Sequence, residues 1–291
     1  MKYWFAMDRN SPNISHERRD FLCNLLKGAA LLLFHGCSSP VNQTCRYLAP
    51  GALPSPRPSA GNRLSTPEPA QPNTCAVHEV APMETVPRLA QMYGVPEREL
   101  MAVNKLKPGE ALKPGQKLII PHPSQYKNIV PVFKNNRWEY IIVHHTAGKK
   151  GKALLVDRIH RERGFEEGLG YHFLIDNGSL GKGNGQVEVA PRWIRQEQGA
   201  HCKASHMNER AIGIGLVGNF NDRKPSAAQM NTLIQLVALL GSHYEIPTSK
   251  VVGHRMVPGA KTDCPGNLFP WQGFQLSLKK VMPPSSMLAK S

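Results

Sequence analysis

Residues 139–145 read Glu-Tyr-Ile-Ile-Val-His-His, an apolar run that predicts a buried strand ending in two histidines. Neighbouring residues on a strand point to opposite faces, so His144 and His145 cannot both reach one site from a regular strand. A second apolar run, Val251–Gly253, leads directly into His254. The sequence therefore predicts two strands that each end in a histidine.

A cysteine follows the second of these strands. Cys264 comes ten residues after His254, and no Cys-x-x-Cys pair of the kind found in structural zinc sites accompanies it. Two imidazoles and one thiolate are suitable zinc ligands, and three protein ligands leave a fourth position open for water. The pattern therefore favours a catalytic zinc site formed by one histidine of the His144-His145 pair, His254 and Cys264.

Several short motifs surround these residues in a fixed order. They are Val143-His144-His145-Thr146-Ala147-Gly148, Gly170-Tyr171-His172-Phe173-Leu174-Ile175, Gly199-Ala200-His201, Asn208 followed by Ile212-Gly213-Ile214-Gly215-Leu216-Val217-Gly218, Gly253-His254-Arg255 and Cys264-Pro265-Gly266. Over roughly residues 137–273 this order resembles the zinc-dependent N-acetylmuramoyl-L-alanine amidases, the family of phage lysozyme-type amidases and peptidoglycan recognition proteins. The resemblance implies an α/β fold with a mixed central β-sheet flanked by helices, and zinc in a groove at one edge of the sheet.

The resemblance also implies roles for individual residues. His144, His254 and Cys264 match the metal ligands, with Asp263 as the competitor for the third place because some members use Asp there. Members that only sense peptidoglycan commonly lack the third ligand. The presence of Cys264 therefore favours an enzyme over a sensor.

Three further positions match the part of the family site that acts on the reacting amide. Tyr171 matches a tyrosine that can donate to the developing oxyanion, although a core tyrosine would also fit the start of a strand. Thr262 stands two residues before the third ligand, and Lys261 would serve if the local loop shifts the register.

Substrate contacts are expected from three other residues. His201 and Asn208 match pocket-wall positions, with a role in loop structure as the alternative. Trp193 could offer an apolar face to sugar or peptide, or could be an ordinary core residue.

Two helices should accompany the sheet. Leu154–Arg163 is amphipathic, and Ser226-Ala-Ala-Gln229 has the pattern of a capping box. The latter opens an apolar repeat of helical spacing made of Met230, Leu233, Ile234, Val237 and Leu240.

An earlier segment predicts a second, smaller domain in the order strand, helix, helix, strand. Its elements are expected at Val77–Val80, Pro87–Tyr93, from Pro96 onward, and at Lys117–Ile120. Tyr93-Gly94-Val95, Leu100, Asn104 and the run from Lys113 to Pro121 resemble a LysM domain, a family that binds N-acetylglucosamine-containing glycans of peptidoglycan and chitin. Its first turn departs from the usual Gly-Asp-Thr-Leu and reads Met83-Glu84-Thr85-Val86. A cap on the next domain without a ligand is the alternative.

The amino-terminal segment has the features of a targeting signal. Arg18-Arg19-Asp20-Phe21-Leu22 before a weakly apolar stretch resembles a bacterial twin-arginine export signal over residues 1–36, with a short buried helix as the alternative. Cys37 stands where a lipoprotein signal places its lipidated cysteine. Prolines then mark residues 37–74 as a spacer, whose flanking Cys45 and Cys75 could pair in an oxidising compartment.

Composition agrees with this division but cannot choose a function. The 291 residues carry a net charge of +15, and no apolar run is long enough for an ordinary membrane-spanning helix. The charge implies anionic partners, and no nucleic-acid-binding motif accompanies it. We expect a signal at 1–36, a linker at 37–74, a LysM domain at 75–122, a catalytic domain at 123–278 and a tail at 279–291. The expected protein is a peptidoglycan hydrolase of the cell envelope or periplasm, attached to the outer membrane if Cys37 is lipidated.

Overall fold

The computed structural model describes residues 46–47, 74–124, 126–134 and 137–282. The expected export signal at 1–36, the lipidation candidate Cys37, most of the expected linker and the end of the expected tail lie outside the described residues. Residues 74–124 are called the small domain below, and residues 126–282 the large domain.

The small domain has the expected order of strand, helix, helix and strand. Its elements are β2 (Thr74–Glu79), α2 (Val86–Tyr93), α3 (Glu97–Val103) and β3 (Lys117–Pro121), and β2 pairs with β3 in antiparallel register. A short strand β1 (Arg46–Tyr47) pairs with β2 in parallel, inside the segment expected to be linker.

Local sequence explains where these helices begin and end. The side chain of Thr85 accepts a hydrogen bond from the Arg88 amide at the start of α2, and Gly94 ends that helix with a φ of 62°. Asn104 then ties α3 to β3, because its side chain donates to the carbonyls of Leu100 and Ile119 and accepts from the Ile119 amide. The bonds to Ile119 fix the end of α3 to β3.

The large domain contains the predicted mixed sheet. Its five strands have the order β6-β5-β7-β4-β8, in which β5 and β6 are antiparallel and the remaining pairs are parallel. The elements are β4 (Tyr140–His145), α4 (Ala153–Glu162), β5 (Phe173–Asn177), β6 (Asn184–Val189), α5 (Pro191–Ile194), η1 (Ala204–His206), α6 (Met207–Arg210), β7 (Ala211–Leu216), α7 (Ala227–His243), η2 (Thr248–Lys250), β8 (Val251–Gly253), η3 (His254–Met256) and α8 (Trp271–Val281). Helix α8 continues past residue 278, where the catalytic domain was expected to end.

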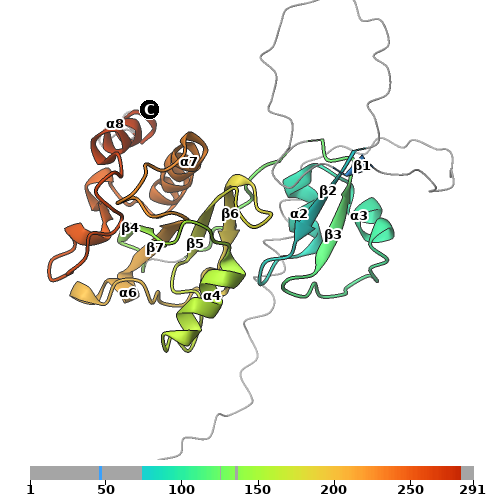
Figure 1. Cartoon of the computed structure of the whole chain (residues 1–291), viewed down its shortest axis with the longest axis horizontal. Coiled ribbons are helices and arrows are strands. Elements are labelled where there is room, and N and C mark those ends of the chain that lie inside the picture. The colour runs from blue at the N-terminus through green and yellow to red at the C-terminus, as the bar shows by residue number, and fades with distance from the viewer. Residues whose placement is uncertain (1–45, 48–73, 125, 135–136, 283–291) are drawn as a thin grey trace, which may run out of the picture. The chain divides into compact units, whose positions relative to one another are not determined.

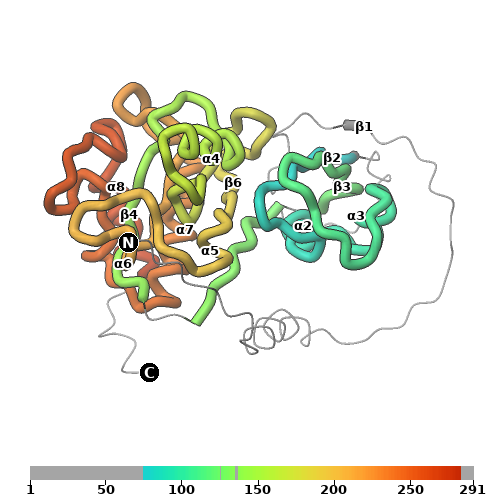
Figure 2. Tube along the Cα trace, turned by 90° about the horizontal axis from the view of Figure 1, so that it is seen from below, coloured from blue at the N-terminus to red at the C-terminus, as the bar shows by residue number. Residues whose placement is uncertain are grey.

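Helices cover both faces of this sheet (Figure 1). Ile141 and Val143 of β4 belong to the main core, which also contains Leu233 and Leu240 of α7. The alternate residue Ile142 faces the opposite side, where it packs with the segment around α6. Figure 2 looks onto that side, with α4 toward the viewer. His144 shares the face of Ile142 because side chains alternate along a strand.

Helix α7 starts as its sequence predicts. The Ser226 side chain accepts from the Gln229 amide, and the Gln229 side chain accepts from the Ser226 amide, which completes the capping box. Gln229 also donates to the carbonyls of Ile175 and Val217, so the same residue fixes the helix to the sheet.

Three cysteines lie among the described residues. Cys75 is disulfide-bonded, and the other cysteines of the described residues, Cys202 and Cys264, are free, so its partner lies outside the described residues. In the part of the chain that the structure describes, no helix combines the length and apolar character needed to cross a bilayer.

Candidate metal centre

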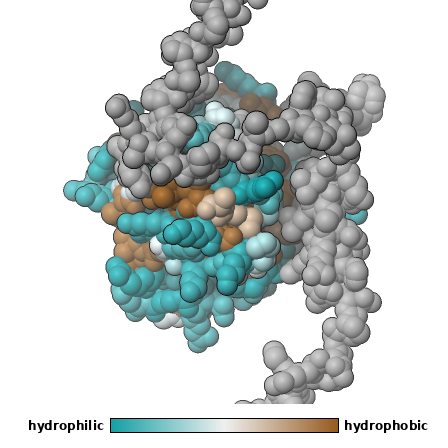
Figure 3. All heavy atoms as spheres, turned by 90° about the vertical axis from the view of Figure 1, so that its right-hand side faces the viewer, coloured by the Kyte–Doolittle hydropathy of each residue, from teal (hydrophilic) through white to brown (hydrophobic). Residues whose placement is uncertain are grey.

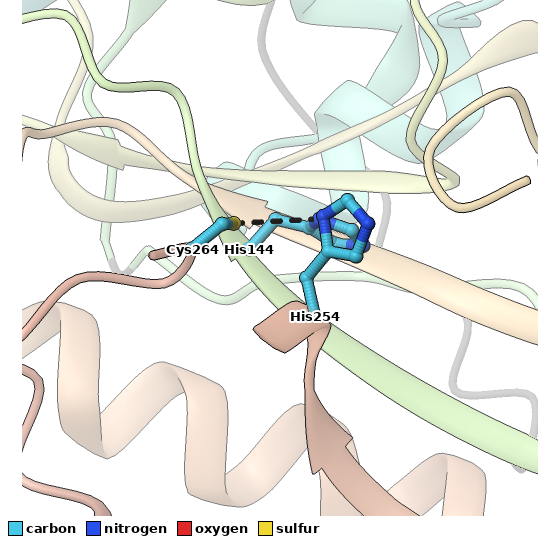
Figure 4. Close-up of side chains that lie close together, drawn as sticks. All are labelled: His144, His254 and Cys264. Carbon is cyan, nitrogen blue, oxygen red and sulfur yellow. Dashed lines mark hydrogen bonds between the residues drawn. The ribbon is translucent and has the colours of Figure 1, made fainter. Parts of the chain in front are cut away.

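Three potential ligands meet at the carboxyl ends of two neighbouring strands (Figure 4). His144 lies near the end of β4, His254 follows β8, and Cys264 lies in the loop before α8. Strands β4 and β8 are paired, which brings their carboxyl ends together. One donor atom from each of His144, His254 and Cys264 lies within 4.8 Å of the others, so the group could hold a metal ion.

The donor geometry fits a tetrahedral ion. Nδ1 of His144 lies 3.6 Å from Sγ of Cys264. A nitrogen and a sulfur bound to one tetrahedral zinc ion, at about 2.0 and 2.3 Å, would be about 3.5 Å apart. The imidazole rings of His144 and His254 also lie close, with centroids 4.7 Å apart. Three donors leave one tetrahedral position for a water or a substrate oxygen.

Burial keeps this site uncharged before a metal binds. Burial lowers the pKa of His144 well below its usual value, and the neighbouring His201 and His254 lower it further. Burial raises the pKa of the Cys264 thiol to about 12, although the His145 amide donates to Sγ at 3.4 Å. Binding a cation there would therefore release the thiol proton, since the thiolate is the ligand.

The neighbouring histidine serves a different purpose. Nδ1 of His145 accepts a hydrogen bond from the Phe220 amide at 3.1 Å. His145 is not in the three-donor group, as expected from the alternation along β4. Asp263, the competing candidate for the third ligand, is exposed and also lies outside that group.

Tyr171 lies beside the donor group. Its ring centroid is 5.2 Å from that of His144, and its hydroxyl donates to the His145 carbonyl at 3.3 Å. Burial raises the pKa of this phenol, so it keeps its proton at neutral pH and remains a donor. Gly215, opposite His144 on β7, makes room for the ring, because a Cβ there would lie 2.6 Å from Tyr171.

The two other expected catalytic positions differ in exposure. Thr262 is half-buried, and its hydroxyl accepts from the Cys264 amide at 3.1 Å. Lys261 is exposed. Thr262 therefore has a defined position next to the third ligand.

The two residues expected in the pocket wall, His201 and Asn208, are hydrogen-bonded to each other, and His201 also contacts His144. Nδ1 of His201 lies 3.0 Å from Nε2 of His144. The side-chain oxygen of Asn208 accepts from the amides of His201 and Cys202. Asn208 thus holds the loop that carries His201.

The expectation that Trp193 presents an apolar face to the substrate is wrong. Its side chain is 0% exposed and belongs to the main core. The ring packs against Phe173, with centroids 4.7 Å apart, and its indole N–H donates to the Pro131 carbonyl. The sequence could not separate the two roles because a tryptophan after a strand suits either.

Sequence reasoning missed His160, which lies in the last turn of α4. Nδ1 of His160 accepts from the Gly170 amide, and its ring centroid lies 5.4 Å from that of Tyr171. Burial lowers its pKa to about 4, so it is neutral at pH 7. Its only sequence signal was a histidine on the apolar face of a predicted helix.

Comparison with known proteins identifies the family. Residues 134–267 match the family described as N-acetylmuramoyl-L-alanine amidase. Peptidoglycan-recognition protein SC2 of Drosophila melanogaster is 30% identical over 140 residues, which cover 45% of this chain and 70% of that protein. The chain belongs to the N-acetylmuramoyl-L-alanine amidase family. Peptidoglycan-recognition protein 2 of Holotrichia diomphalia is 28% identical over 47% of this chain and 74% of its own length.

The small domain has a family of its own. Residues 78–121 match the LysM domain. Among solved structures, an N-acetylmuramoyl-L-alanine amidase from Clostridium intestinale is 32% identical, with a TM-score of 0.43, over 53% of this chain and 94% of that one. The present chain therefore carries a LysM domain before its amidase domain.

Proposed function

We propose that this amidase-family protein is a zinc-dependent N-acetylmuramoyl-L-alanine amidase that cuts peptidoglycan. The bond cleaved would be the amide between the lactyl group of N-acetylmuramic acid and L-alanine of the stem peptide. The observation that carries the proposal is the complete donor group of His144, His254 and Cys264 with one tetrahedral position left open.

The donor group is suited to zinc in particular. Imidazole nitrogen and thiolate sulfur together favour zinc over magnesium or calcium, which prefer oxygen ligands. In a three-ligand site zinc supplies a nucleophile at neutral pH by acidifying water, and it polarises the carbonyl under attack. The protein's part is to hold the three ligands and to orient the amide carbonyl.

Tyr171 is the expected partner of the negative charge that develops on the carbonyl oxygen. Its phenol is buried, protonated and beside His144. In the present structure its hydroxyl donates a hydrogen bond of 3.3 Å to the His145 carbonyl, a long bond to a neutral acceptor that a developing oxyanion can replace. We assign the second role at the reacting amide to Thr262, two residues before Cys264 and hydrogen-bonded to its amide, with Lys261 as the alternative.

The LysM domain is proposed to hold the glycan strand. Glycans offer apolar sugar faces as well as hydroxyl groups, and the face of the LysM domain drawn in Figure 3 shows hydrophobic residues bordered by hydrophilic ones. Glu84 occupies the usual aspartate position of the first turn, but it is buried and paired with His78 at 2.7 Å. This turn would therefore contribute shape and backbone groups to glycan binding rather than that carboxylate.

Export through a twin-arginine signal and lipidation of Cys37 remain part of the proposal. The disulfide at Cys75 supports an oxidising compartment, where peptidoglycan is also found. We place the protein in the cell envelope or periplasm, with membrane attachment depending on Cys37.

The rival function is peptidoglycan binding without hydrolysis. Cys264 argues against it, because a protein that only binds has no use for a complete metal site. The test is digestion of purified sacculi with zinc-loaded and chelated protein, followed by mass spectrometry. Hydrolysis predicts stem peptides with a free L-alanine amino group only in the zinc-loaded sample. Stoichiometric zinc without released peptide would leave the binding function.

A further inference from the structure

We infer that His201 is a positioning residue that fixes which ring nitrogen of His144 faces the metal. The inference rests on the proposed metal site and adds a residue outside the three-donor group. It assigns to His201 a role different from the substrate contact expected from the sequence.

The assignment follows from a chain of hydrogen bonds that ends on a backbone carbonyl. Nε2 of His201 lies 3.2 Å from the Ala211 carbonyl oxygen, which can only accept, so Nε2 of His201 carries a proton. In the neutral ring the other nitrogen, Nδ1, is then a bare acceptor. That Nδ1 lies 3.0 Å from Nε2 of His144.

The next hydrogen bond determines the proton position on His144. Since Nδ1 of His201 accepts, Nε2 of His144 must be the donor and carry the proton. Nδ1 of His144 is then unprotonated, and this is the atom that lies 3.6 Å from Sγ of Cys264. The backbone carbonyl of Ala211 thus determines, through His201, that His144 offers a lone pair to the metal.

The ring of His201 is held in a slot made by two glycines. A Cβ at Gly199 or at Gly213 would overlap the imidazole of His201. Asn208 fixes the backbone at His201 by accepting from its amide at 2.8 Å. The Gly-x-Gly pattern of β7 therefore makes room for two rings beside His144: Gly213 for His201 and Gly215 for Tyr171.

Without His201 the proton on His144 would have no fixed acceptor. Both neutral tautomers of His144 would then become populated, and one of them places a proton on the metal-binding nitrogen. A partner of this kind typically changes metal affinity by about 10–100-fold when removed. The expected loss is in zinc binding, with the rest of the fold unaffected.

The first test is nitrogen NMR on the full-length, metal-free protein labelled in histidine. The wild-type spectrum should show His144 and His201 each protonated at Nε2, with Nδ1 bare. In His201→Leu the His144 signals should shift toward a mixture of tautomers. A His144 protonated at Nδ1 in the wild type, or unchanged in His201→Leu, would overturn the inference.

The second test is zinc affinity, measured by competition with a coloured chelator. His201→Leu should bind zinc about 10–100-fold more weakly than the wild type. His201→Asn places an amide oxygen near the position of Nδ1 and should recover part of the loss. Exposed His206, in the same loop, provides the control, and His206→Leu should match the wild type.

The alternative to a positioning role is a purely structural one. A structural role for His201 would lower the denaturation midpoint while leaving the His144 tautomer and the zinc affinity unchanged, and this result would overturn the inference. If His201→Leu does not fold, Gly213→Ala is the second variant, because its Cβ displaces the His201 ring and should weaken zinc binding. If the wild type binds zinc but releases no stem peptide, the proposed activity fails while these two readouts still decide the role of His201.

Discussion

Nδ1 of His144 and Sγ of Cys264 lie 3.6 Å apart although 120 positions separate the two residues in the chain. The pairing of β4 with β8 brings the end of β4 to the loops that follow β8, and His254 starts the first of these. The donor group is therefore assembled by the sheet itself. A site assembled in this way should bind zinc without a large change of structure.

Removing the thiol should abolish zinc binding and hydrolysis together. We expect Cys264→Ala to lose stoichiometric zinc, because two imidazoles alone are a weak site. Metal analysis and release of stem peptides measure the two effects, and binding to sacculi should persist through the LysM domain. Cys202→Ala is the matched control, since Cys202 is also buried and free but lies outside the donor group. Full zinc occupancy in Cys264→Ala would refute the assignment of the third ligand.

Removing the Tyr171 hydroxyl should separate catalysis from metal binding. Tyr171→Phe keeps the ring that packs on His144, so zinc occupancy should be unchanged. Turnover should fall by about 10²–10³-fold, the usual effect of deleting one oxyanion donor. Tyr140→Phe, at the opposite end of β4, is the control. Equal kcat values for Tyr171→Phe and wild type would remove Tyr171 from the mechanism.

Trp193 should contribute to stability rather than to substrate binding. Trp193→Ala removes a fully buried ring, which should lower the free energy of unfolding by about 3–5 kcal/mol. Denaturant titration measures this loss. The milder Trp193→Phe should stay folded and bind sacculi as the wild type does. Weaker sacculus binding in a stably folded Trp193→Phe protein would restore a substrate role for this residue.

Asn104 should matter for the LysM domain alone. Asn104→Ala removes the two hydrogen bonds to Ile119 that link the end of α3 to β3, and it leaves the Ile119 amide and carbonyl without these partners, a cost of about 1–3 kcal/mol for each unpaired group. Co-sedimentation with sacculi should weaken, while hydrolysis of a small soluble muropeptide should not change. A parallel loss of both activities would mean that the two domains do not act independently.

Acid should destabilise the metal-free protein. Burial lowers the pKa values of His144, His160, His172 and His201, to about 4 for His160 and about 3 for His201. The unfolded chain therefore binds more protons than the folded one below pH 6.5, and stability falls as the pH decreases. Each such imidazole contributes up to about 1.4 kcal/mol per pH unit between its folded value and 6.5.

Denaturant midpoints measured in chelator at pH 7, 6 and 5 should decrease steadily. In His160→Asn, which keeps an acceptor for the Gly170 amide but cannot titrate, the decrease should be less steep. Identical midpoints at pH 7 and pH 5 would show that these histidines are not held neutral by burial.

Much of the fold could be predicted from the sequence because the patterns that indicate its strands and helix starts are local. The alternation along Glu139–His145 predicted that only one of the two histidines enters the site, and the Ser226–Gln229 pattern predicted the start of α7. Strand β1 was missed because two residues beside a proline-rich stretch give no periodic pattern. Its pairing with β2 depends on tertiary contacts that the local sequence does not encode.

The metal-ligand candidates were predictable, and the residues behind them were not. His144, His254 and Cys264 stand at strand ends or beside turn residues, where type and spacing carry information. Whether His201 faces the substrate or the back of His144 depends on the slot at Gly199 and Gly213, which only the packed structure reveals. Trp193 was misassigned for the same reason, since burial is a property of the whole core.

The central claim, zinc-dependent cleavage of the lactyl amide, is tested most directly by hydrolysis of a defined disaccharide-peptide in water enriched in oxygen-18. Mass spectrometry of the two products shows which of them carries the solvent oxygen and therefore which bond was cleaved. We predict one heavy oxygen in the lactyl carboxylate of the sugar product, an unlabelled stem peptide beginning with L-alanine, and no product in chelator. Label in any other product, or unchanged cleavage in chelator, would contradict the account.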